Sequence, residues 1–135
     1  MTFLIAYAGA LLTFGALDAL WLTTMGAALY RATLGDLLAT DIRLAPAIGF
    51  YLVYPVGIVA FAALPALRAE SIGIAIGYGA LFGAIAYATY DLTNYATLRT
   101  WSLQITLVDI VYGAVASAIA AAAGYLLVRG VSPWL

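Results

Sequence analysis

The chain contains no cysteine, no histidine and no lysine, and only 8% of its 135 residues are charged. Without cysteine there are no disulfides or thiolate nucleophiles, and cysteine usage says nothing about the redox compartment. Without histidine there are no histidine zinc ligands, no histidine-ligated haem and no Ser-His-Asp triad. Asp, Glu, Tyr, Ser, Thr and Arg are left for chemistry. Five basic residues against six acidic ones form no basic patch, which argues against nucleic-acid binding.

Apolar residues dominate what is present. They make up 67% of the chain, and its mean hydropathy is +1.10. A soluble domain has roughly 25% charged residues and about half its residues apolar. A protein core cannot bury the excess, so the composition predicts an integral membrane protein whose solvent is the lipid bilayer. No feature of the composition identifies a cofactor.

Four segments are long and apolar enough to cross a bilayer, which takes about 20 residues of helix. Their apolar runs are continuous rather than alternating, which favours helices over a β-barrel. The N-terminus lacks the basic region of a signal peptide and is expected to be a retained first helix. The sequence predicts one all-α domain over residues 1–135, a bundle of four transmembrane helices at about Thr2–Thr23, Pro46–Leu67, Ser71–Asn94 and Leu103–Val128.

The connections define a topology. Leucines recur near helical spacing within Met25–Arg43, which predicts a short interfacial helix between the first and second spans. With four spans, both termini lie on one side of the membrane and the first and third loops on the other, which we call the loop face. Three of the five arginines (Arg31, Arg43 and Arg99) lie on the loop face, which weakly favours a cytoplasmic loop face.

Three aspartates, Asp18, Asp91 and Asp109, lie inside or at the ends of these spans. An ionisable group at membrane depth costs at least about 2.5 kcal/mol and usually marks a functional site. The first and third helices leave the membrane at the loop face, and the second and fourth enter there. All three carboxylates, together with Tyr51 and Tyr54 of the second helix, are therefore predicted to meet near the loop face.

Helical faces support this convergence. Gly79, Gly83, Tyr87 and Asp91 recur at intervals of four, and the fourth span repeats that interval from Asp109 through Gly113. The small residues are explained most simply as helix contacts. The aspartates also have structural explanations, as helix ends or as partners of tyrosine hydroxyls, an asparagine or an arginine. The predicted ligand-binding set is Asp18, Trp21, Tyr51, Tyr54, Tyr87, Tyr90, Asp91, Asn94, Asp109 and Tyr112.

Aromatic residues closer to the span ends have a different interpretation. Tyrosine and tryptophan often anchor transmembrane helices at the level of the lipid head groups. We assign that role to Tyr30, Tyr95, Trp101 and Trp134. The sequence contains no nucleophile–base motif and no acidic metal-binding signature, so no catalytic or metal-binding residues are predicted.

Several strings resemble a family of small bacterial membrane proteins classified as a domain of unknown function. The strings are Tyr-Asp-Leu-Thr-Asn at residues 90–94, Asp-Ala-Leu-Trp at 18–21, Leu-Val-Asp-Ile at 107–110, and Tyr51, Tyr54 and Gly57. The resemblance covers nearly the whole chain. It implies a four-span protein of the bacterial inner membrane, and it implies no activity.

Three functions are compatible with the sequence. The first and preferred one is binding or transport of a small cationic or amphipathic molecule by a homodimer or larger assembly, with proton coupling as one variant of it. The second is an accessory or assembly subunit of a larger membrane complex, in which the polar cluster locks the helices together. The third is an enzyme that modifies a lipid head group with paired carboxylates.

Overall fold

A computed structural model describes the backbone of residues 1–134 and the side chains of residues 1–133. The predicted anchoring role of Trp134 lies outside the described side chains. Four helical segments are long and apolar enough to cross a membrane: Thr2–Leu37, Leu44–Arg68, Ile72–Thr97 and Leu103–Val131. The all-α fold and the four predicted spans are confirmed. The bounds of the last three spans differ from the prediction by at most three residues, whereas the first span continues to Leu37 instead of ending near Thr23.

The first span is longer than expected. Helix α1 (Thr2–Met25) continues without a break into a π-helical turn, η1 (Gly26–Arg31), then into α2 (Ala32–Leu34) and the 3-10 turn η2 (Gly35–Leu37). Gly26 has helical dihedral angles, so it does not end the helix. The α-helix ends at Gly35, whose φ of +50° only glycine adopts at little cost. The segment expected as a separate helix is thus a continuation of the first span. Its position at the membrane interface stays a prediction.

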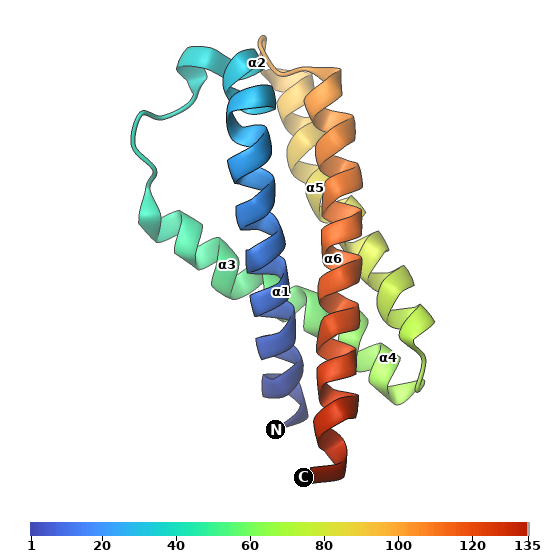
Figure 1. Ribbon diagram of the computed structural model, residues 1–135. Coiled ribbons are helices and arrows are strands. Elements are labelled where there is room, and N and C mark those ends of the chain that lie inside the picture. The colour runs from blue at the N-terminus through green and yellow to red at the C-terminus, as the bar shows by residue number, and fades with distance from the viewer. Residues whose placement is uncertain (135) are drawn as a thin grey trace.

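The second span is also irregular. It comprises α3 (Leu44–Ile58), the π-helical turn η3 (Val59–Ala63) and α4 (Leu64–Arg68), and Pro55 lies inside α3. A proline removes the helical hydrogen bond to the carbonyl four residues earlier and clashes with that carbonyl, so an irregular turn just before it is expected. Pro65, in the first turn of α4, comes just after η3. Figure 1 shows the span crossing the bundle obliquely, with the N-terminal end of α3 well below the loop that joins α5 to α6.

Helices α5 (Ile72–Thr97) and α6 (Leu103–Val131) pack tightly along each other, and α1 packs on α6. Glycines permit this approach. A Cβ atom added to Gly79 would lie 2.8 Å from the carbonyl oxygen of Ser117, and one added to Gly124 would lie 2.7 Å from that of Ala6. The small-residue stripes therefore do serve as helix contacts, as the simplest interpretation of the sequence held.

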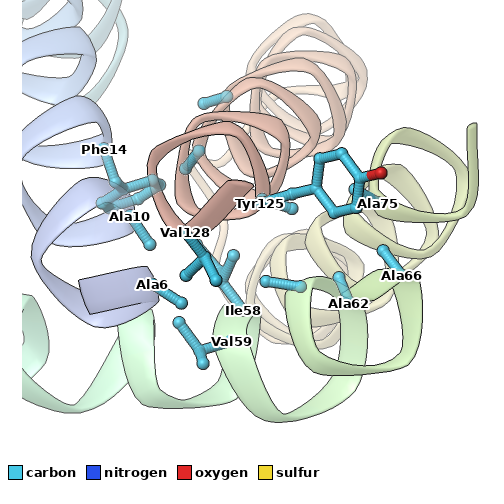
Figure 2. Packing of buried hydrophobic residues seen from close by; sticks show 14 residues of the cluster. Ala6, Ala10, Phe14, Ile58, Val59, Ala62, Ala66, Ala75, Tyr125 and Val128 are labelled. Carbon is cyan, nitrogen blue, oxygen red and sulfur yellow. The ribbon is translucent and has the colours of Figure 1, made fainter. Parts of the chain in front are cut away.

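The larger of two buried hydrophobic clusters lies toward the end of the bundle that carries the two termini. Figure 2 shows Ala6, Ala10 and Phe14 of α1 facing Ile58 and Val59 of the second span, with further buried residues from α5 and α6 around them. Most of these side chains are small, so the four helices approach closely there. The bulkier and more polar side chains are concentrated in the other half, toward the loop face.

The glycine contact between α5 and α6 is testable by substitution. We expect Gly79→Ala to lower the free energy of unfolding by about 1–3 kcal/mol, because the added methyl group overlaps the backbone of α6. Gly77→Ala is the matched control, since a Cβ at Gly77 meets nothing within 4 Å. We expect that change to stay within about 1 kcal/mol, the helix-propensity difference. Equilibrium unfolding in mixed micelles measures both, and equal stabilities would contradict the packing.

Candidate functional site

A cavity of about 520 Å³ lies in the loop-face half of the bundle, and all four spans contribute to its lining. Eight of the ten residues in the predicted ligand-binding set line it. They are Asp18, Trp21, Tyr54, Tyr87, Tyr90, Asp91, Asp109 and Tyr112. The structure thus brings together the three aspartates that the topology predicted to converge. That these residues bind a ligand is a separate prediction.

The other two candidates have different positions. Tyr51 does not line the cavity, but its hydroxyl donates a hydrogen bond to Oδ2 of Asp18 and so lies directly behind that carboxylate. Asn94 lies one turn beyond Asp91 on α5 and does not line the cavity. The structure therefore associates Tyr51 with the site through Asp18 and places Asn94 outside its lining.

Asp18 of α1 is held by tyrosines from two other spans. The Tyr112 hydroxyl of α6 donates to Oδ1 at 3.0 Å, and the Tyr51 hydroxyl of α3 donates to Oδ2. The ring of Tyr112 is stacked on Trp21, with ring centres 4.2 Å apart and planes at 11°. Because both oxygens accept hydrogen bonds from tyrosines of other spans, this carboxylate is held in one orientation.

Asp109 of α6 has a partner that the sequence analysis missed. The Tyr30 hydroxyl donates to Oδ1 of Asp109 and accepts a hydrogen bond of 2.9 Å from Nε1 of Trp21. Tyr30 was expected to be an interfacial anchor. The helical continuation through η1 places its half-buried ring in the cavity lining, with its hydroxyl bonded to Asp109, and its depth in the membrane stays a prediction. The sequence signal that could have identified Tyr30 as a site residue was the lack of a proline between Thr23 and Gly35, which allows the first helix to continue.

Trp101, also expected as an interfacial anchor, is buried and lines the cavity. Its Nε1 donates to the hydroxyl of Thr106 at 3.2 Å, and Tyr90 packs edge-on against its ring. The Ser102 side chain caps the N-terminus of α6 by accepting from the amide of Ile105, which fixes the short loop that carries Trp101. The remaining lining residues are apolar and carried no distinguishing signal in so apolar a chain: Leu22, Leu34, Leu38, Phe50 and Ala86.

Asp91 differs from the other two aspartates. Its exposed fraction is 0%, against 7% for Asp18 and 6% for Asp109, and neither carboxyl oxygen has a hydrogen-bond partner among the described residues. Buried polar atoms without partners are uncommon in native proteins, because each forfeits its hydration without compensation. Of the three aspartates, Asp91 is therefore the one whose carboxyl oxygens receive no hydrogen bond from the described part of the chain.

No basic side chain offsets these carboxylates in the cavity lining, because the chain has no lysine and none of its arginines lines the cavity. Aromatic rings form much of the remaining wall. Tyr54 and Tyr87 meet edge to face, and the Tyr54 hydroxyl pairs with Ser117 at 2.9 Å. Within residues 1–134, no group of three His, Cys, Asp or Glu residues is placed to hold a metal ion. The cavity therefore combines acidic acceptors with apolar and aromatic surfaces.

The hydrogen bonds to Asp18 should contribute to stability. We expect Tyr112→Phe, which keeps the ring stacked on Trp21 and removes the donor, to lower the free energy of unfolding by about 0.5–2 kcal/mol. Tyr78→Phe, on an exposed face of α5, is the control and should leave stability unchanged. Unfolding in mixed micelles compares the two. A Tyr112→Phe protein as stable as the wild type would argue that this bond contributes nothing.

Comparison with known proteins adds the family. Residues 3–126 match the family model described as a predicted membrane protein family, DUF2177, so the chain belongs to that family. No curated protein and no solved structure matches the chain. Family and fold together describe a multi-pass membrane protein with four apolar helices. The description of the family gives a membrane location, and it names no reaction and no ligand.

Proposed function

We propose that this DUF2177 member binds a small molecule with a cationic group in the carboxylate–tyrosine cavity. The observation that carries the proposal is the charge of the lining, which contains three aspartates and no basic side chain. Intramembrane carboxylates are rare and usually pair with a cation or with each other. In the described structure Asp18 and Asp109 accept from tyrosine hydroxyls, and neither receives a positive charge from the cavity lining.

The aromatic walls support the same proposal. A cation over the face of a tryptophan or tyrosine ring is attracted by the negative face of the ring, by about 2 kcal/mol where water is excluded. Trp21, Tyr87 and Tyr112 all line the cavity beside the carboxylates. An aromatic side chain can also contact the apolar substituents of an organic cation. Carboxylates alone would not favour such contacts.

The size of the cavity fits a small organic molecule. Ligand pockets in proteins usually measure roughly 300–1,000 Å³, and are mainly apolar with a few polar groups that fix orientation. The cavity of about 520 Å³ lies inside that range. The cavity is mostly apolar and larger than a bare ion needs. Its size and lining therefore favour an organic cation over a metal ion.

The proposal extends to the setting of the site. We propose that the protein lies in the bacterial inner membrane. If the ligand is transported as well as bound, we propose that several copies of this four-span chain form a homo-oligomer. Proton coupling is tested by titrating the ligand in buffers with different ionisation enthalpies. A heat of binding that depends on the buffer would mean that protons are exchanged on binding, and a heat that does not would argue against coupling.

Charge removal at Asp109 tests the binding site. We expect Asp109→Asn to weaken binding of hexylamine, in its ammonium form at neutral pH, by at least about tenfold, since a hydrogen bond to a charged group contributes about 1.5–3 kcal/mol. Isothermal titration in detergent micelles measures the affinity. Trp21 and Trp101 line the cavity, so tryptophan fluorescence gives a second readout.

The matched control is Asp41→Asn, which removes the same charge from an exposed position between the first and second spans. We expect its affinity for hexylamine to equal that of the wild type. If Asp109→Asn and Asp41→Asn bind equally well, or if the wild type binds no amine, the proposed function is wrong. Circular dichroism and gel filtration establish that each variant is folded.

The two other hypotheses from the sequence have different tests. An accessory subunit would co-purify with a stoichiometric membrane partner in mild detergent, and a head-group-modifying enzyme would change a phospholipid supplied in vesicles. The charge and size of the cavity favour cation binding over both. We therefore keep binding or transport as the proposal.

A further inference from the structure

The cavity is open at one side, and the side chains at its opening are apolar or aromatic. Among the lining residues, Leu22, Phe50 and Tyr90 are the strongly exposed ones, with exposed fractions of 49%, 41% and 63%. They come from α1, α3 and α5, so the opening lies among three different spans. We call this set of three residues the mouth.

The mouth opens within the membrane-spanning part of the bundle. Phe50 lies about 9 Å from the N-terminal end of α3 and Tyr90 about 10 Å from the C-terminal end of α5, at 1.5 Å per residue. Val53 and Ile85 are exposed apolar side chains on the same two helices. In a membrane protein such surfaces contact lipid. The mouth is therefore continuous with the lipid-facing surface of the bundle.

The shape of the second span creates this opening. Figure 1 shows α3 running obliquely, with its N-terminal end displaced from the loop-face ends of α1 and α5. The second span contacts α5 mainly through η3 and α4, its later part. In the loop-face half, α3 and α5 therefore diverge, and Phe50 and Ala86 line the cavity from opposite helices across the divergence.

The chemistry changes from the mouth inward. Apolar and aromatic side chains surround the entrance, whereas Asp18, Asp91 and Asp109 lie deeper and are almost fully buried. Asp91 adds two buried acceptor oxygens without donors among the described residues. A molecule that matches this arrangement carries N–H donors and a positive charge at one end and an apolar chain at the other.

We infer that the ligand is a membrane-dissolved amphiphile with a protonated amine head. It enters the cavity laterally, from the loop-face leaflet of the bilayer, which we call lateral entry. The inference rests on the proposed function and narrows its ligand class. The ammonium head lies against Asp18 and Asp109, close to Asp91, and the alkyl chain leaves through the mouth between α3 and α5 into the lipid. A compact water-soluble amine would make only the contacts with the aspartates and none with the mouth.

Chain length tests this in the wild-type protein. Propylamine and dodecylamine are titrated into protein in phosphatidylcholine nanodiscs, and the partition of each amine into empty nanodiscs is measured and subtracted. We expect dodecylamine to bind at least tenfold more tightly than propylamine. Asp109→Asn should weaken both amines by a similar factor, because both use the same head-group contacts.

A bulky side chain in the cavity wall beside the mouth gives an independent test. Ala86 lines the cavity one turn before Tyr90, whereas Ile85 is exposed and does not line it. We expect Ala86→Trp to weaken dodecylamine binding at least tenfold and Ile85→Trp, which adds the same ring facing lipid, to change it less than twofold. The chain-length comparison in the wild type needs neither variant to fold.

The outcomes separate the two proposals. If propylamine binds as tightly as dodecylamine and both depend on Asp109, the ligand is a compact cation, so the lateral-entry inference is wrong and the proposed function stands. Equal dodecylamine binding by folded Ala86→Trp and Ile85→Trp proteins would also overturn the inference. If neither amine binds the wild type, both proposals fail.

Discussion

The acyl chains of lipids donate no hydrogen bonds, so a carboxylate inside a membrane bundle takes its donors from the protein, from water or from a ligand. Here tyrosines supply the donors at two of the three aspartates, Tyr51 and Tyr112 at Asp18 and Tyr30 at Asp109. A neutral donor holds a carboxylate in position without cancelling its charge, unlike an arginine. The cavity consequently keeps an acidic lining, and the proposal of cation binding depends on that property.

The two halves of the bundle have opposite packing, and the second depends on the first. Toward the termini, glycine and alanine let the helices approach until backbone atoms are in contact, as at Gly79 and Gly124. Toward the loop face, large aromatic side chains replace them and hold the helices apart around the cavity. The close contacts fix the helices against each other, and so the aspartates of different spans keep their relative positions.

Much of this arrangement was predictable from the sequence. Hydropathy and length gave the four spans, and direction of travel placed Asp18, Asp91 and Asp109 near one face, because a helix in a membrane has only two possible directions. Two features were not predicted. The continuation of the first helix past Met25, which brings Tyr30 to Asp109, passes through Gly26, a residue type that often ends helices but that here has helical dihedral angles. The oblique path of α3, which opens the mouth, depends on tertiary packing around Pro55 and η3 that local sequence does not encode.

The central claim is that the three aspartates share one cavity walled by tyrosine and tryptophan. An experimental density map of the protein in nanodiscs, at a resolution that resolves side chains, tests it most directly. The account predicts the carboxylates of Asp18 and Asp109 in contact with the hydroxyls of Tyr112 and Tyr30, with Asp91 beside the same space. Carboxylates that point outward to separate regions of lipid or water would contradict it.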